Sequence, residues 1–224
     1  MQRIWSRILG SAVLWSALNA GAVDVAREPS NLTAAKAAVR TYVTSGGYES
    51  DIAMVADQAI EWIQERVARD TAAEKLAIVL DIDETVLSNY PHMDREDFGY
   101  NAADWIAWVE QGRAPVIEPM RAVYREARRL GVAVIFLTGR TDPAEKPGTL
   151  LNLERVGLGD YARIIFKTKE DTAPTAAERK AKRRAEVTAD GWTIIASIGD
   201  QFSDIEGGYA ERGFKLPNPF YQIP

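Results

Sequence analysis

The chain has 224 residues, 46% of them apolar, which is enough for one α/β domain with a sizeable core. Its formal net charge is −5 and it offers no basic patch, so we expect no binding to a nucleic acid polymer. With no cysteine and a single histidine, we expect no disulfide framework, cysteine nucleophile, lipid attachment through cysteine, or histidine-rich metal site.

The first 22 residues are predicted to be a secretory signal peptide. Arg3 and Arg7 form a basic start, residues 8–18 are mostly apolar, and residues 20–22 are small, as a cleavage site requires. The apolar run is too short to span a membrane, which takes about 20 residues. We therefore predict cleavage after Ala22, a periplasmic or secreted location, and no stable membrane anchor.

Two helices are predicted ahead of the first strand. The first covers residues 32–43 after Asn31, which can cap it, and is broken at Gly46 and Gly47. The second covers residues 50–69. Its apolar stripe consists of Ile52, Val55, Ala59, Ile60, Trp62, Ile63 and Val67. Within residues 23–74, both are expected to form an accessory helical layer rather than part of the sheet core.

An apolar strand at residues 78–80 runs directly into Asp81, Asp83 and Glu84. A short strand of this kind is typical of parallel sheets, where ligands gather beyond the carboxyl ends of the strands. Asp81 and Asp83 point to the same side, and their repulsion favours a bound cation such as Mg²⁺ or a shared proton. Taken alone, the pair also fits an acidic turn that caps the next helix.

Residues 88–118 replace a regular crossover helix and are predicted to form a cap-like insertion over the site. A helix is expected at residues 102–110, carrying Trp105 and Trp108 at a spacing more typical of core aromatic residues than of ligand contacts. Tyr90 and Phe98 lie outside that helix and are the better candidates for ligand contact. His92 is expected to be a solvated loop residue rather than a catalytic group.

From residue 120 onward, helices and apolar strands alternate, which predicts a parallel sheet with right-handed crossovers. The expected helices are residues 120–130, 149–156, 176–189 and 203–211, and the expected strands are residues 132–137, 164–166, 193–198 and 214–216. Polar residues follow the apolar part of these strands: Thr138, Gly139 and Arg140 in a predicted turn, and later Asp200 and Asp204. With a lysine from the basic helix, this set matches the needs of phosphoryl transfer through an aspartyl phosphate.

Several motifs resemble those of haloacid dehalogenase superfamily phosphatases. More narrowly, they resemble acid phosphatase subfamily IIIB, which contains plant vegetative storage proteins and bacterial lipoprotein acid phosphatases. The matching segments are residues 81–89, 136–140, 149–153, 199–204 and 214–219, and the resemblance covers residues 32–223. It implies an α/β fold for residues 23–224, with a Rossmann-like parallel sheet flanked by helices and a small helical cap.

The resemblance also implies roles for individual residues. Asp81 becomes the nucleophile, and Asp83 the acid and then the base. Thr138 donates a hydrogen bond to a phosphoryl oxygen, and Gly139 and Arg140 are further substrate-binding residues. Mg²⁺ is then held by the carboxylate of Asp81, the backbone carbonyl of Asp83 and Asp200, with Asp204 near that shell.

The site cation implied by the resemblance is Lys180, which lies 20 residues before Asp200, as in the plant sequences. It follows Arg179, where plant members have an aromatic residue. Lys182, Arg183 and Arg184 compete for the role, and solvated charges on a helix face are the alternative for all but one of these cations.

The function implied is an exported, Mg²⁺-dependent phosphomonoesterase acting on small phosphate esters, with 5′-nucleotidase-type specificity as one alternative. Tyr90 and Phe98 are predicted to flank the leaving group. A storage or binding protein with a vestigial site is a second alternative, and retention of every motif counts against it. A receiver-like domain phosphorylated by a partner is a third, and the export signal and the insertion argue against that.

Overall fold

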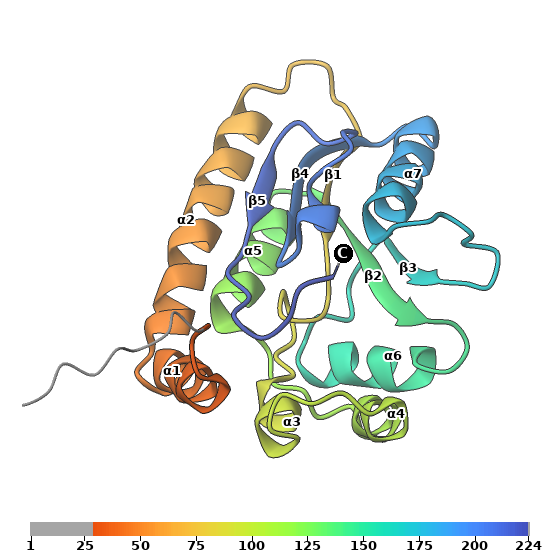
Figure 1. The fold of residues 1–224 in the computed structure, drawn as a ribbon. Coiled ribbons are helices and arrows are strands. Elements are labelled where there is room, and N and C mark those ends of the chain that lie inside the picture. Colours follow the sequence, from red (N-terminus) through yellow and green to blue (C-terminus); the bar gives the residue numbers. More distant parts are fainter. Residues whose placement is uncertain (1–28, 224) are drawn as a thin grey trace, which may run out of the picture. The chain divides into compact units, whose positions relative to one another are not determined.

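The computed structural model describes residues 29–223, so the predicted signal peptide at residues 1–22 lies outside the described residues. Five strands form one sheet in the order β3-β2-β1-β4-β5, and all four neighbouring pairs are parallel (Figure 1). They are β1 (Leu76–Leu80), β2 (Ala133–Thr141), β3 (Arg163–Lys167), β4 (Thr193–Gly199) and β5 (Gly213–Lys215). The predicted α/β fold with a parallel sheet is confirmed.

The helices connect and flank these strands. They are α1 (Leu32–Thr44), α2 (Gly47–Ala68), α3 (Tyr90–Arg95), α4 (Ala102–Gln111), α5 (Glu118–Arg129), α6 (Lys146–Arg155), α7 (Ala176–Ala189) and the single 3₁₀ turn η1 (Phe202–Asp204). None of the helices in the described part of the chain is long and apolar enough to cross a membrane.

The central strand β1 is buried on both faces of the sheet. Ile78 and Leu80 belong to the core formed with α2 and α5, whereas Ala77 and Val79 belong to a second core that includes Val187 of α7. Successive side chains of a strand point to opposite faces, so an unbroken aliphatic run is what a two-sided core requires. Full burial of a large aliphatic side chain contributes about 1.5–3 kcal/mol, and β1 therefore anchors both halves of the domain.

The second helix is part of this core, so its prediction as an accessory layer is wrong. Ile52, Ala59 and Ile63 of α2 are buried, and the helix packs against α5 and the sheet (Figure 1). The indole Nε1 of Trp62 donates to the carbonyl of Ile195 in β4 at 2.8 Å. The apolar stripe of α2 covers a sheet face that water would otherwise reach. In contrast, α1 has no buried residue.

Strand β2 is longer than its apolar run suggested. Thr138, Gly139 and Arg140 were predicted as a polar turn, yet they belong to β2, and Thr141 beyond them pairs with Lys167 of β3. Pairing with the neighbouring strand keeps the backbone extended after the apolar residues end. A prediction based on hydrophobicity alone therefore ended the strand too early.

The helix predicted over residues 203–211 is also wrong. Only the 3₁₀ turn η1 forms, and Gly207 and Gly208 follow in left-handed conformations, with φ of 85° and 81°. The carboxylate of Asp204 turns back and accepts a hydrogen bond from the backbone N–H of Gln201 at 2.8 Å. The two glycines, which adopt positive φ at no steric cost, end the helical conformation after a single turn.

The strand order creates the crevice that holds the site. After β1 the chain adds β2 and β3 on one side, and then crosses back to add β4 and β5 on the other. Ligands of such sheets bind beyond the carboxyl ends of the strands at this switch point. The backbone N–H of Asp81 donates to the carbonyl of Ile198 at 3.0 Å, so the residues that follow β1 and β4 lie side by side.

Candidate active site

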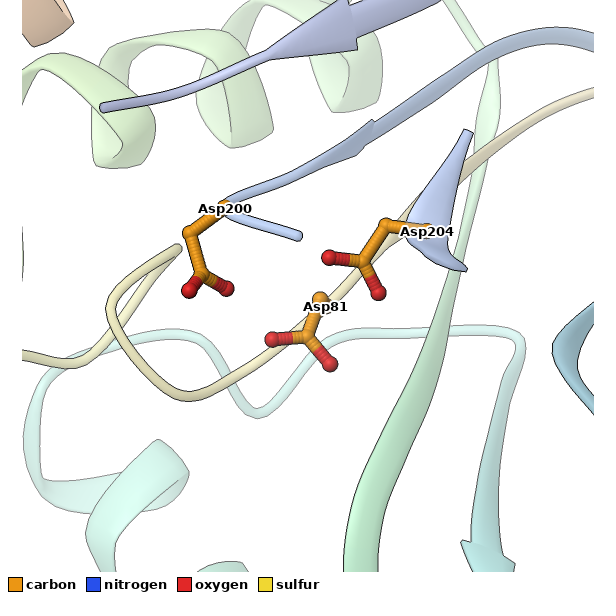
Figure 2. Close-up of side chains that lie close together, drawn as sticks. All are labelled: Asp81, Asp200 and Asp204. Carbon is orange, nitrogen blue, oxygen red and sulfur yellow. The ribbon is translucent and has the colours of Figure 1, made fainter. Parts of the chain in front are cut away.

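Three carboxylates meet where β1 and β4 end. Asp81 follows β1, Asp200 follows β4 and Asp204 ends η1, and one oxygen of each lies within 4.8 Å of the others (Figure 2). All three side chains are buried. The structure therefore brings together three of the four aspartates that were predicted to surround a metal.

The electrostatics of this cluster favour a bound cation. Burial raises the pKa of Asp81 well above its usual value, Lys180 opposes that rise, and the neighbouring aspartates add to it. Burial and the charge of Asp204 raise the pKa of Asp200 to about 6. Three carboxylates and one ammonium leave two negative charges to be neutralised. Hard oxygen donors with that surplus charge fit a divalent cation such as Mg²⁺.

Lys180 reaches into this cluster from α7. Its Nζ donates to Asp81 Oδ1 at 2.7 Å and also contacts Asp204 Oδ1. Burial alone would lower the pKa of Lys180, but the two carboxylates outweigh burial and raise it, so the ammonium stays charged.

The neighbouring cations of α7 that compete with Lys180 are placed elsewhere. Lys182 is exposed, Arg183 pairs with Asp171 and Glu186, and Arg184 donates to backbone carbonyls. Of these candidates, Lys180 is the one that contacts the carboxylate cluster.

The carboxylate of Asp83 lies outside the cluster. Arg140 donates to it from Nη2 at 2.7 Å and from Nε at 3.0 Å, and Asn89 Nδ2 donates to it at 2.8 Å. The guanidinium of Arg140, predicted to bind substrate, is thus occupied by Asp83 and by Thr149, whose Oγ1 lies 3.0 Å from Nη1. The reason is topological, because β1 and β2 are neighbouring parallel strands and both residues lie beyond the apolar parts of these strands. Sequence analysis missed this pair and the role of Asn89.

Thr138 and Gly139 lie in the carboxyl-terminal half of β2. Thr138 is fully buried, and its Oγ1 accepts a hydrogen bond from the backbone N–H of Arg140 at 3.0 Å. Gly139 lines a cavity that Asp81 and Lys180 also line, and no atom lies within 4 Å of the place where a Cβ of residue 139 would stand. The backbone at Gly139 is therefore open to a ligand.

A cavity of about 780 Å³ opens above Asp81 and Lys180. Its aromatic lining consists of Phe98, Tyr100, Trp105, Phe220 and Tyr221. Several of these residues come from the 88–118 segment. The cavity thus combines a charged floor with aromatic walls.

Of the two aromatic residues predicted to contact the leaving group, only Phe98 lines this cavity. Tyr90 belongs to α3 and packs against Phe220, with ring centroids 5.6 Å apart, so its assignment is corrected. Phe98 stacks on the same ring at 6.3 Å with an interplanar angle of 10°. Trp105, expected to be a core residue, lines the cavity and donates from Nε1 to Glu145 Oε1 at 2.6 Å.

His92 is buried, contrary to its prediction as a solvated loop residue. It lies in α3 and stacks on Trp108 at 5.7 Å with an interplanar angle of 15°. Burial and the nearby charge of Arg95 lower its pKa, which favours the neutral imidazole. The polar neighbours of His92 in sequence concealed its burial, because helix α3 turns them away from Trp108.

Residues 217–223 return to the site after β5. Asn218 Nδ2 and Gln201 Nε2 both donate to Asp200 Oδ2, at 2.5 Å and 2.6 Å. Asn218 Oδ1 in turn accepts the backbone N–H groups of Phe220 and Tyr221. This segment therefore orients Asp200. In the sequence, Asn218 stands between two prolines within the matching segment 214–219.

Glu84 is a buried carboxylate that sequence analysis did not place in the site. Burial and the charge of Asp83 raise its pKa to about 8. It accepts hydrogen bonds from the backbone N–H of Asn89 at 2.6 Å and from the hydroxyl of Tyr221 at 3.1 Å. Glu84 thus connects the loop after β1 to residues 217–223.

A family model described as HAD superfamily, subfamily IIIB (acid phosphatase) matches residues 6–224. The chain belongs to this family. As a subfamily IIIB member it is a phosphoric monoester hydrolase, and the predicted resemblance is confirmed.

Several plant proteins are relatives of this chain. Acid phosphatase 1 of Solanum lycopersicum is 34% identical over 189 residues, covering 83% of this chain and 73% of that protein. The stem 28 kDa glycoprotein of Glycine max is 35% identical over 193 residues, covering 83% and 74%. Vegetative storage protein 1 of Arabidopsis thaliana is 28% identical over 195 residues, covering 84% and 70%.

The fold of this acid phosphatase is shared with a bacterial one. The tungstate-bound class C acid phosphatase of Bacillus anthracis superposes with a TM-score of 0.69 at 22% identity, covering 85% of each chain. At that identity the likeness shows the fold.

Proposed function

We propose that this acid phosphatase is an exported, Mg²⁺-dependent enzyme that hydrolyses small phosphate monoesters through an aspartyl phosphate on Asp81. The observation that carries the proposal is the position of Asp81 on the floor of the cavity, 2.7 Å from Lys180 and beside two further carboxylates. A carboxylate nucleophile needs a nearby cation to remain ionised when it is buried. The basic, apolar and small-residue order of residues 1–22 supports export to the periplasm or the exterior.

In the first step an oxygen of Asp81 attacks the phosphorus of the ester. The bond from phosphorus to the ester oxygen breaks, and Asp83 gives its proton to that oxygen, so the alcohol leaves neutral. Lys180 opposes the rise that burial causes in the pKa of Asp81 and so favours the ionised nucleophile. Thr138 would stabilise a phosphoryl oxygen from the end of β2.

In the second step Asp83 takes a proton from water, and the water oxygen displaces Asp81 from phosphorus. Inorganic phosphate leaves and both carboxyl groups return to their starting states. Arg140 and Asn89 hold the Asp83 carboxylate through the three hydrogen bonds described above, which fixes its direction. Asp83 is thereby held in the lining of the cavity, where it would act on the leaving oxygen and then on water.

Asp81 and Asp200, with Asp204 adjoining and the backbone carbonyl of Asp83, would hold Mg²⁺. When bound, the ion neutralises the surplus negative charge of the cluster and that of the phosphoryl oxygens. Asn218 and Gln201 orient Asp200 for this role through their hydrogen bonds to Oδ2.

The test is turnover of p-nitrophenyl phosphate with and without EDTA, and with Asp81→Asn. We expect EDTA to stop turnover, added Mg²⁺ to restore it, and the nearly isosteric Asp81→Asn to lose several orders of magnitude in kcat while still folding. More than a few per cent of activity in Asp81→Asn would rule out the covalent mechanism.

A storage protein with a vestigial site is the competing function, and the vegetative storage protein relatives favour it. Absence of turnover in the wild-type protein with Mg²⁺ present would support that alternative. A receiver-like protein would accumulate a long-lived phosphoaspartate without steady turnover, and the same assay separates it from both.

A further inference from the structure

Arg179 is a buried cation at the cavity that has no carboxylate partner. Its exposed fraction is 5%, it lines the cavity, and its Nη1 donates to the backbone carbonyl of Thr138 at 3.2 Å. Within residues 29–223 its guanidinium forms no ion pair. A guanidinium has five N–H donors, so most of them are left over. No guanidinium nitrogen of Arg179 is both fully enclosed and without a hydrogen-bond partner. The remaining N–H donors are therefore accessible from the cavity that Arg179 lines.

The other buried cations around the cavity are already neutralised. Arg140 is paired with Asp83, and Lys180 is shared between Asp81 and Asp204. The charges of both residues are already neutralised by these carboxylates, whereas a phosphoryl group adds two negative charges. Among the buried basic residues that line the cavity in the described part of the chain, Arg179 alone has no carboxylate partner.

An unpaired buried guanidinium is unfavourable for the protein without ligand. Burial lowers the pKa of Arg179, and the more distant charges of Asp171 and Asp81 offset this only in part. Buried charges in proteins are paired or bind ligands, because removing a charge from water costs several kcal/mol. Arg179 therefore reduces stability, and an anion in the cavity would compensate for the cost.

The contacts of Arg179 place its guanidinium beside the expected phosphoryl position. It donates to the backbone carbonyl of Thr138 in the carboxyl-terminal half of β2, and the residue after Arg179, Lys180, contacts Asp81, which follows β1. A phosphoryl group on Asp81 would lie beside these segments of β1 and β2. A planar fork of N–H donors is also the geometry that matches two oxygens of a phosphate.

We propose that the guanidinium of Arg179, on the β2 side of the cavity, donates hydrogen bonds to the non-bridging oxygens of the substrate's phosphoryl group. The proposal rests on the proposed function. It divides the work between adjacent residues of α7, because Lys180 neutralises the enzyme carboxylates while Arg179 neutralises the incoming dianion.

The test compares Arg179→Gln and Arg179→Lys with the control Arg183→Gln. Arg183 lies one turn further along α7, pairs with Asp171 and Glu186, and does not line the cavity. Two quantities are measured for each protein: kcat/KM for p-nitrophenyl phosphate, and the dissociation constant of inorganic phosphate by isothermal titration with Mg²⁺ present. The third measurement is the melting temperature without phosphate. Replacing a structural residue lowers the melting temperature, whereas replacing a residue that only binds ligand does not.

For Arg179→Gln we expect phosphate to bind about tenfold to a hundredfold more weakly, with a similar fall in kcat/KM. Arg179→Lys should regain part of both losses, and Arg183→Gln should stay within about twofold of wild type. Without phosphate, Arg179→Gln should melt at or above the wild-type temperature, because it removes an unpaired buried charge.

Unchanged phosphate affinity in Arg179→Gln would overturn the proposal. It would also be overturned if kcat/KM for p-nitrophenyl phosphate fell as much in Arg183→Gln as in Arg179→Gln, because the loss would then be a general effect of removing a cation from α7. Titration separates this result from failure of the proposed function. If wild-type protein binds phosphate more tightly than Arg179→Gln but does not hydrolyse the ester, the proposed function is wrong and the role of Arg179 in phosphate binding stands.

Discussion

Replacing Phe98 with alanine removes one aromatic wall of the cavity, and Tyr90→Ala provides a matched control. Both rings pack against Phe220, at centroid distances of 6.3 Å and 5.6 Å, so both substitutions lose a similar contact. Only Phe98 lines the cavity. A difference between the two variants therefore reports contact with the substrate rather than loss of packing.

The magnitude follows from the energy of stacking a base on an aromatic ring, which is about 1–3 kcal/mol. At about 1.4 kcal/mol per factor of ten, Phe98→Ala should lower kcat/KM for a nucleoside 5′-monophosphate by about tenfold to a hundredfold. Glycerol phosphate has no ring to stack, so its kcat/KM should change far less. Tyr90→Ala should affect the two substrates equally.

The assay is the ratio of kcat/KM for the nucleotide to that for glycerol phosphate, measured in wild type and both variants. A loss of folded protein lowers both values together and cancels in the ratio. If Phe98→Ala leaves this ratio at the wild-type value, Phe98 does not stack on the leaving group and the reasoning is refuted.

Four further predictions follow from the remaining features. Thr138→Ala should lower kcat by on the order of 10²-fold, because one donor to the transferring group is lost, and an unchanged kcat would show that Thr138 makes no such contact. Asn218→Ala should raise the Mg²⁺ concentration for half-maximal activity by about tenfold or more, because its hydrogen bond orients Asp200, the carboxylate that we propose binds Mg²⁺; an unaltered Mg²⁺ titration would contradict this. Gly148→Ala should lower the free energy of unfolding by about 1–3 kcal/mol in a denaturant titration, because a Cβ there would stand 2.2 Å from the carbonyl oxygen of Val109; wild-type stability would show that α4 and α6 move apart freely. Amino-terminal sequencing of exported protein should begin at Val23, and a start at Met1 would exclude cleavage.

The sequence by itself determined the parallel sheet and the carboxylates that follow its first strand. An aliphatic run followed by Asp81 and Asp83 predicts a strand buried on both faces with carboxylates at its end, because these properties depend on local order along one strand. Helix α7 was predicted with the bounds Ala176–Ala189 for the same reason, since its sequence pattern is local.

Only the tertiary structure decided which side chains face each other. Arg140 was expected to bind substrate, and β2 places it against Asp83 instead. His92 has polar neighbours in sequence, yet α3 packs it on Trp108. Arg179 and Lys180 are adjacent basic residues of one helix, but only Lys180 meets carboxylates. Burial and pairing across long sequence separations follow from how helices and strands pack, and a linear pattern of residue types does not contain that information.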